Sequence, residues 1–517
     1  MRARTNLAVG LLAFAVAATV VPAPAIAEGA PVLRLVGTYA TGLASGDGET
    51  TSGEVAAVAG RLLYVSNASD VSVDIVDISR PASPRLLRRV DLSGFGDEVT
   101  SVAASRSMVA ATLDRGAGPG ALVLFSPGGT NLRSLPVGSG PDMVTFTPDG
   151  TRLLVANEGE PTGYGRPGDV DPPGSVSVVE LDPRLRLATH TVGFDAFDPG
   201  GPRAAELPAG VRIFGSPLPS LDLEPEYITV SDDSTTAWVS LQENNAIAVV
   251  DLTALNVARI DALGFKDHSL PGNGLDGSDQ DGGINIRPWA NVRGMYQPDA
   301  LAAFTAAGET YVLSANEGDA REYAGLDEAA RLRSVTTDAS FGPARANNQV
   351  GRLNVTTSPP AGAAPQSTAY AFGARSFSVW SGRDGSLVYD SGDLLERTTA
   401  AALPDRFNAS NTSNAFDGRS DDKGPEPEAA AAGVINGRTY GFIGLERIGG
   451  VVVVDLGDPR APVIVQYVNN RAFAGDAIGP DSGPEVIKVV PAAESPTRRA
   501  LVVVSNEITG TVSIYTS

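Results

Sequence analysis

The chain has 517 residues and a formal net charge of −21, from 39 basic and 60 acidic residues. Hydrophobic residues make up 42% of it, which is enough for a large core and excludes a globally disordered chain. A field of this sign repels nucleic acids and anionic membranes and attracts cations. The lack of cysteine excludes disulfides, thiolate zinc and cysteine nucleophiles, and the two histidines are too few for a three-histidine zinc site.

The first 27 residues have the pattern of a secretory signal peptide. Arg2 and Arg4 precede an apolar stretch over residues 7–21, and Ala25 and Ala27 form an A-x-A cleavage site. The stretch is short for a bilayer span, although a retained anchor is the alternative. No second apolar run of membrane length follows in the sequence. We therefore expect an exported, extracellular protein without a transmembrane span.

One sequence unit recurs seven times after this segment. Each unit has an acidic residue, a short apolar strand, a turn, a second apolar strand and a third strand, as in DMVTFTPDGTRLLVANEGE from Asp142. Four short strands per unit without a helical period predict an all-β, seven-bladed β-propeller. Two β-sandwiches in tandem are the alternative, but they predict no register of acids at the unit starts. The units begin at Glu54, Glu98, Asp142, Glu226, Asp299, Glu428 and Glu485.

The last unit ends after its third strand, TVSIYTS at residues 511–517. We expect its fourth strand at the other end of the chain, where PVLRLVGTYATG at residues 31–42 has the fourth-strand pattern. Such a strand would close the ring and remove an exposed sheet edge. Residues 28–517 are therefore expected to form a single propeller, with insertions near residues 159–173, 195–222, 262–296 and 320–375.

Acidic residues at the strand ends are candidates for a binding site. The first strand of each blade lines the channel of a propeller, so these acids are expected to meet at one channel mouth. Crowded carboxylates must take up protons, pair with arginine or bind a cation, and oxygen ligands suit Ca²⁺ or Mg²⁺. The alternative is that each acid only caps a turn. The predicted metal ligands at the mouth are Asp142, Glu158, Glu226, Glu243, Asp299, Glu317, Glu428, Glu446, Glu485 and Glu507.

Two further segments add acidic residues. Asp276, Asp279 and Asp281 alternate with small residues as in calcium-binding loops. The alternative is an ordinary turn-rich loop, which has the same composition. The segment 417–428 leads directly into the sixth unit and contains both acids and cations, with a solvated acidic loop as the alternative. Positive charge near the mouth could hold an anionic ligand such as phosphate beside the metal. The predicted ligand-binding residues are Arg293, Arg321, Asp421, Asp422, Lys423, Glu426 and Arg447.

Catalytic motifs give no further guidance. The sequence contains no nucleophile elbow, no P-loop and no dinucleotide-binding glycine motif, so no catalytic residue is predicted. His190 falls in the fourth segment of a blade and is expected to be structural. His268 falls in an insertion, where an exposed loop histidine is expected, although it could approach the mouth.

A family resemblance is carried by phrases from nearly the whole chain after residue 27, among them GPDMVTFTPDGTRLLVANEGEP (140–161), DGSDQDGGINI (276–286), SANEGDAREY (314–323) and FDGRSDDKGPEPE (416–428). They are similar to the choice-of-anchor I family, which includes mesenchyme-specific cell surface glycoproteins and bacterial proteins labelled alkaline phosphatase. The resemblance implies a secreted seven-bladed propeller, and it implies phosphatase activity only through those labels. Members often carry a C-terminal anchoring segment, and this sequence departs from them at TVSIYTS.

Two functions stay open at this point. The first is a binding protein, expected to be a monomer, that holds a divalent cation, expected to be calcium, and an extracellular ligand or anionic small molecule at the mouth. The second is a calcium-dependent phosphoesterase at the same mouth, similar to propeller phytases, in which carboxylate-held calcium binds phosphate and activates water. A structural adhesion scaffold is a third alternative.

Overall fold

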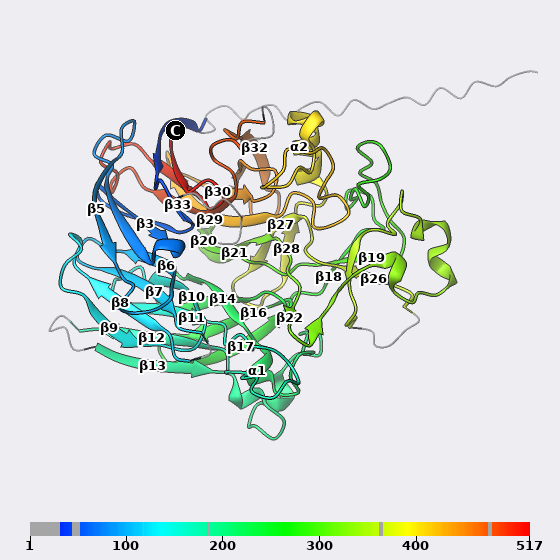
Figure 1. Cartoon of the computed structure of the whole chain (residues 1–517), viewed down its shortest axis with the longest axis horizontal. Coiled ribbons are helices and arrows are strands. Elements are labelled where there is room, and N and C mark those ends of the chain that lie inside the picture. The colour runs from blue at the N-terminus through cyan, green and yellow to red at the C-terminus, as the bar shows by residue number, and fades with distance from the viewer. Residues whose placement is uncertain (1–31, 44–51, 117, 183–186, 361–365, 474–477) are drawn as a thin grey trace, which may run out of the picture.

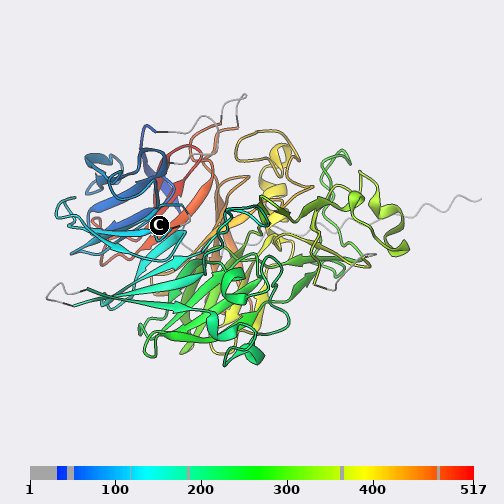
Figure 2. The ribbon, with the colours of Figure 1, turned by 60° about the horizontal axis from the view of Figure 1, so that its bottom comes forward.

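The computed structural model describes residues 32–43, 52–116, 118–182, 187–360, 366–473 and 478–517. They form a ring of β-sheets with one extension at its side (Figure 1, Figure 2). Seven of the sheets are four-stranded, which confirms the predicted seven-bladed propeller. The predicted signal peptide, residues 1–27, lies outside the described residues. In the described part of the chain, every helix is too short or too polar to pass through a bilayer.

The first four sheets consist of strands that are consecutive in the chain. Sheet 1 contains β2 (Ala56–Ala59), β3 (Leu62–Asn67), β4 (Ser72–Asp77) and β5 (Arg85–Asp91). Sheet 2 contains β6 (Glu98–Ala104), β7 (Val109–Asp114), β8 (Ala121–Phe125) and β9 (Arg133–Pro136). Sheet 3 contains β10 (Pro141–Phe146), β11 (Arg152–Asn157), β12 (Ser175–Leu181) and β13 (Leu187–Gly193). Sheet 4 contains β14 (Pro225–Val230), β15 (Thr236–Leu241), β16 (Ala246–Asp251) and β17 (Asn256–Ala262).

The other three sheets complete the ring. Sheet 5 contains β20 (Leu301–Ala306), β21 (Glu309–Asn316), β27 (Ser376–Ser381) and β28 (Leu387–Asp390). Sheet 6 contains β29 (Pro427–Ile435), β30 (Arg438–Leu445), β31 (Val451–Asp455) and β32 (Val463–Val468). Sheet 7 contains β33 (Pro484–Val490), β34 (Leu501–Asn506), β35 (Thr511–Thr516) and, from the other end of the chain, β1 (Arg34–Ala40).

The N-terminal strand closes the ring as the repeat predicts. β1 runs antiparallel to β35, from the pair Arg34–Thr516 to the pair Ala40–Thr511. The first strands of the sheets contact one another in the order β2, β6, β10, β14, β20, β29 and β33, and β33 contacts β2. The channel is therefore lined by first strands all the way round.

One buried apolar cluster lies between each pair of neighbouring sheets. Tyr64 of sheet 1, for example, packs with Val99 of sheet 2, and Trp238 of sheet 4 packs with Trp380 of sheet 5. Both faces of a sheet are thus covered, which explains why the middle strands are continuous apolar runs such as VVVV in β31. Burial of this kind supplies the main stabilising free energy of the ring.

The extension beside sheets 4 to 6 comes from two of the predicted insertions (Figure 1). Its five strands, in sheet order, are β18 (Phe265–Asp267), β19 (Val292–Met295), β26 (Ala369–Ala371), β25 (Asn354–Thr356) and β24 (Ala329–Arg331). They enclose an eighth cluster that includes Trp289, Phe341 and Val355. The two insertions therefore fold together, because β19 of one pairs directly with β26 of the other. Strands of sheet 5 lie between them in the chain but not in space.

Short elements fill the remaining connections. They are the hairpin β22 (Glu322–Tyr323) and β23 (Leu326–Asp327), the α-helices α1 (Pro219–Asp222) and α2 (Leu394–Ala402), and 3₁₀ segments at Ala68–Asp70, Asp195–Phe197, Ala204–Glu206, Leu332–Ser334, Ala339–Arg345 and Pro404–Arg406.

Candidate functional site

A recurring backbone irregularity places the acids at the start of the first strands. In sheets 3, 4, 6 and 7 the register with the second strand shifts just after a proline, at Pro141, Pro225, Pro427 and Pro484. The acid that follows each proline therefore lies in a β-bulge, which turns its side chain away from the regular alternation. These acids are Asp142, Glu226, Glu428 and Glu485.

Sheet 2 departs from the predicted pattern. Its register shift lies between Val99 and Ser101, so Thr100 takes the position that an acid has in the other sheets. Glu98, predicted as the acid of this unit, is exposed, and it lies opposite Asp114 in the register of β6 with β7. Thr100 lines the channel instead of Glu98, because the bulge lies two residues further along the chain than Glu98.

Inside the channel, acids from several sheets share a cavity of about 80 Å³. Glu54, Asp142, Asp299 and Glu485 line it. Burial, reinforced by the charges of Asp299 and Glu54, raises the pKa of Asp142 well above its usual range. Burial and the charge of Glu507 do the same to the pKa of Glu485. These carboxyls lie close together inside the channel, and each one makes its neighbours harder to ionise.

At the channel mouth, three acids bring carboxylate oxygens within 4.8 Å of one another: Glu317, Glu428 and Glu446. Glu317 follows β21, Glu428 lies in β29 and Glu446 follows β30, so two sheets supply them. All three are buried, with 6–8% of their surface exposed. Two of them are oriented by amides, since Gln242 Nε2 donates to Glu317 at 2.8 Å and Asn411 Nδ2 donates to Glu446 at 2.7 Å.

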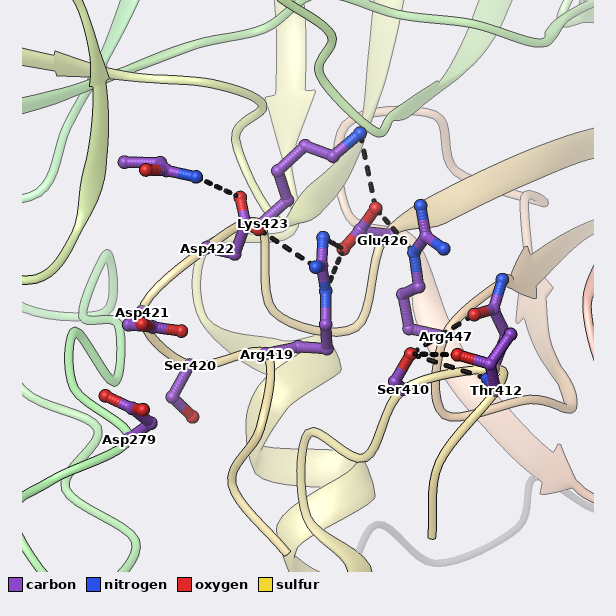
Figure 3. Close-up of polar contacts among 12 residues, drawn as sticks. Asp279, Ser410, Thr412, Arg419, Ser420, Asp421, Asp422, Lys423, Glu426 and Arg447 are labelled. Atoms are coloured by element: carbon purple, nitrogen blue, oxygen red, sulfur yellow. Dashed lines mark hydrogen bonds and ion pairs between the residues drawn. The ribbon is translucent and has the colours of Figure 1, made fainter. Parts of the chain in front are cut away.

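Cations lie next to this triad. Lys423 Nζ is 2.5 Å from Glu317, and Arg447 is 3.0 Å from Glu446. Figure 3 shows Arg419, Lys423 and Arg447 all directed at Glu426, with ion pairs of 2.5, 3.2 and 2.9 Å. Although burial opposes ionisation, these three cations hold the pKa of Glu426 well below its usual range. Glu426 is therefore the counterion that gathers the cations at the mouth.

The remaining acids of this wall are harder to ionise than free carboxyls. Asp299 is hydrogen-bonded to Glu428, and Glu507 is hydrogen-bonded to Glu446. Burial raises the pKa of Asp299 and that of Glu507 to about 7. The wall thus contains more carboxyl groups than its three cations can neutralise.

The adjoining wall of the mouth comes from sheets 3 and 4. Glu243 lines a mouth cavity of about 440 Å³ together with Glu160, Tyr323, Lys423 and Arg447. Glu243 and Glu226 are only 7% and 8% exposed, and an Oε2 atom of each has no hydrogen-bond partner among the described residues. Burial and the charges of Glu160 and Asp142 raise the pKa of Glu158 beside them. Unpartnered buried oxygens are costly, so these atoms are open positions for a ligand.

Several predicted ligand-binding residues take part in ion pairs. Arg321 is enclosed by Asp222 at 2.8 Å and Glu224 at 3.2 Å. Arg293 pairs with Asp267 in the extension at 2.7 Å and is not among the described residues that line the mouth cavity. Asp422 lines that cavity and pairs with Arg419 at 2.9 Å.

The predicted calcium loop is rearranged. Asp279 pairs with Arg352, which also holds Asp421 at 2.6 Å. Asp276 and Asp281 instead meet Asp417, with oxygens of all three within 4.8 Å. Burial raises the pKa of Asp276 and that of Asp417 to about 7.

The two histidines differ in burial, and His268 contradicts the expectation from the sequence. His190 lies exposed on the outer strand β13. His268 is fully buried, and its Nδ1 bonds to the carbonyl of Asn273 at 2.7 Å, so the expectation of an exposed loop histidine is wrong. Burial lowers the pKa of His268 well below its usual range.

Sequence comparison identifies related proteins. The family model described as "Choice-of-anchor I domain" matches residues 54–459. Gigasin-3a of Magallana gigas is 30% identical over 200 residues, which covers 36% of this chain and 67% of that protein. Mesenchyme-specific cell surface glycoprotein of Strongylocentrotus purpuratus is 30% identical over 283 residues, which covers 46% of this chain but only 36% of that protein.

Two solved structures are similar at low sequence identity. The β-propeller domain of Cps50 (Swd1) from Myceliophteria thermophila is 11% identical with a TM-score of 0.46, and the match covers 94% of this chain and 100% of that one. Hydrazine synthase of Kuenenia stuttgartiensis is 12% identical with a TM-score of 0.47, covering 91% of this chain and 96% of that one.

Proposed function

Since this chain belongs to the choice-of-anchor I domain family, we propose that it is an exported propeller whose channel mouth binds a divalent cation and an anionic extracellular ligand. The observation that carries the proposal is the convergence of Glu317, Glu428 and Glu446 within 4.8 Å beside the mouth cavity. Two oxygens that each lie about 2.4 Å from one Ca²⁺ ion can be up to about 4.8 Å apart, so the spacing suits calcium.

The donor set also favours a hard cation. The triad offers only oxygen ligands, which prefer Ca²⁺ or Mg²⁺ to softer metals. The raised pKa values of Asp299 and Glu507, which are hydrogen-bonded to Glu428 and Glu446, favour protons where a cation would otherwise neutralise the acids. A cation that binds here would compete with protons for these carboxyls.

The ligand class follows from the cations of the mouth. Arg419, Lys423 and Arg447 all line the mouth cavity, next to the acidic triad. An anionic group that enters this cavity could contact the bound cation and these side chains together. An extracellular setting is supported by the sea urchin relative, which is named as a cell surface glycoprotein.

Calcium titration of Glu317→Gln tests the cation site. Loss of one charged oxygen ligand is expected to weaken calcium binding at the mouth by about tenfold or more. Glu309→Gln is the matched control, because Glu309 is exposed at the opposite end of the same strand, β21. Isothermal calorimetry on both variants makes the comparison, and equal calcium affinity in Glu317→Gln and wild type would contradict the proposal.

The second candidate function, a calcium-dependent phosphoesterase, is favoured by Lys423 and Arg447 lying beside the triad. A bound cation would polarise a phosphoryl group and activate water, while these two side chains would bind and orient phosphoryl oxygens. The purified protein should then hydrolyse a phosphomonoester with calcium and lose this activity after chelation. If none of a broad panel of phosphate esters is hydrolysed, the phosphoesterase function is excluded and binding is the function that is left.

A further inference from the structure

A second acidic triad lies in the segments that connect the extension with sheet 6. Asp276 and Asp281 come from the loop between β18 and β19, whereas Asp417 comes from the connection between α2 and β29. These segments are far apart in the chain, yet their carboxylate oxygens lie within 4.8 Å of one another. Asp276 is fully buried, and Asp417 is 3% exposed.

The charge at this triad is not balanced. Among the described residues, no lysine or arginine forms an ion pair with Asp276, Asp281 or Asp417. The nearby acids Asp279 and Asp421 are both paired with Arg352. Arg352 therefore neutralises acids next to the triad, whereas the triad itself has no basic ion-pair partner in the described part of the chain.

One buried oxygen next to the triad is open. Ser420 Oγ donates to Asp417 Oδ1 at 2.5 Å. Asn408 is fully buried, and its Nδ2 donates to the same Ser420 Oγ at 2.8 Å. Its Oδ1 atom has no hydrogen-bond partner in the described part of the chain. A buried oxygen without a partner, one hydrogen-bonded residue away from Asp417, is consistent with a ligand at the triad.

We infer that Asp276, Asp281 and Asp417 form a second divalent-cation site, separate from the mouth. Three carboxylates whose oxygens lie within 4.8 Å of one another suit Ca²⁺, whose remaining ligands can be water. Asp417 replaces Asp279 of the loop predicted from sequence, because Asp279 is held by Arg352.

This second cation would fix the start of the mouth segment, residues 417–428. Ser420 is joined to Asp417 by its hydroxyl and accepts from Arg375 at its carbonyl, while Arg375 also donates to the carbonyl of Asp276. Figure 3 shows Ser420 and Asp421 at one end of this segment and Lys423 and Glu426 at the other. A cation at the triad would therefore order the residues that face the mouth.

Calcium binding by Asp417→Asn and Asp281→Asn tests the inference, with Asp279→Asn as the matched control from the same loop. Asparagine keeps the size of each side chain, and Asp281 is only half-buried, so at least this variant should fold. Each triad variant should lose one calcium equivalent by calorimetry, while the control keeps the wild-type stoichiometry. Wild-type stoichiometry in both triad variants would overturn the site.

Hydrogen exchange separates this site from the mouth. Calcium should slow amide exchange in residues 417–428 of the wild type and of Glu317→Gln, but not of Asp417→Asn. If the mouth binds no cation, Glu317→Gln will keep the wild-type stoichiometry while the triad variants still lose one equivalent. Calcium-independent exchange of the mouth segment in the wild type would overturn its ordering by the triad.

Discussion

Deletion of residues 32–41 is expected to yield a protein that aggregates or unfolds. The deletion removes β1, so β35 becomes an open sheet edge with unpaired backbone groups. It also removes Leu33 from the cluster between sheets 6 and 7 and Tyr39 from the cluster between sheets 7 and 1. At roughly 25 cal/mol per Å² of exposed apolar surface, the loss reaches several kcal/mol, against a total stability of about 5–15 kcal/mol.

Tyr39→Phe is the mild counterpart of this deletion. It removes only the hydrogen bond from the Tyr39 hydroxyl to Asp74, while Asp74 keeps its ion pair with Arg89 at 2.7 Å. We expect a loss of about 1 kcal/mol and a folded, monodisperse protein. Thermal unfolding and size-exclusion chromatography compare the two proteins with a control truncated only as far as Ala30. A deletion mutant as stable as that control would show that β1 does not hold the ring closed.

The number of sheets and the closure of the ring are predictable from the sequence because both follow from the repeated order of strands. Each unit repeats the same order of apolar strands and turns, and β1 has the pattern of the fourth strands that it joins. The position of individual side chains is less predictable. Thr100 lines the channel in place of Glu98 because a bulge, which the sequence does not mark, shifts the register of β6.

Pairing between strands outside the repeat is the part that the sequence could not predict. β19 and β26 are direct neighbours in their sheet, although two strands of sheet 5 come between them in the chain. Nothing in the local sequence indicates their parallel pairing. For the same reason, the acids of the predicted calcium loop could not be assigned correctly. Whether Asp279 binds a cation or pairs with Arg352 depends on where a residue more than seventy positions away lies.

Calcium should stabilise the protein most strongly near neutral pH. The pKa values of Asp276, Asp299, Asp417 and Glu507 are raised to about 7 in the folded protein. In the unfolded chain these groups titrate near pH 4, so the folded protein holds more protons between about pH 4 and 7. Without metal, the free energy of unfolding should therefore fall as the pH rises through this window.

Calcium reverses that loss because it replaces the protons. At saturating calcium we expect the melting temperature at pH 7.5 to rise by on the order of 5 °C, with a much smaller rise at pH 5. Binding at pH 6 should release protons, which calorimetry detects as a dependence of the heat on the ionisation enthalpy of the buffer. Asp417→Asn has one such proton fewer to release and should show a weaker buffer dependence.

The same measurements discriminate between a cation and internal neutralisation of the acids. If Lys423 and Arg447 alone balanced the mouth, calcium would change neither the melting temperature nor its dependence on pH. Their ion pairs reach Glu317, Glu426 and Glu446, however. Among the described residues, none of the ion pairs involves Asp299, Glu428 or Glu507. A divalent cation that binds a hydrogen-bonded carboxyl pair should displace its proton, because the cation neutralises the carboxylates more strongly. Calcium binding without proton release at pH 6 would therefore place the ion away from these carboxyls.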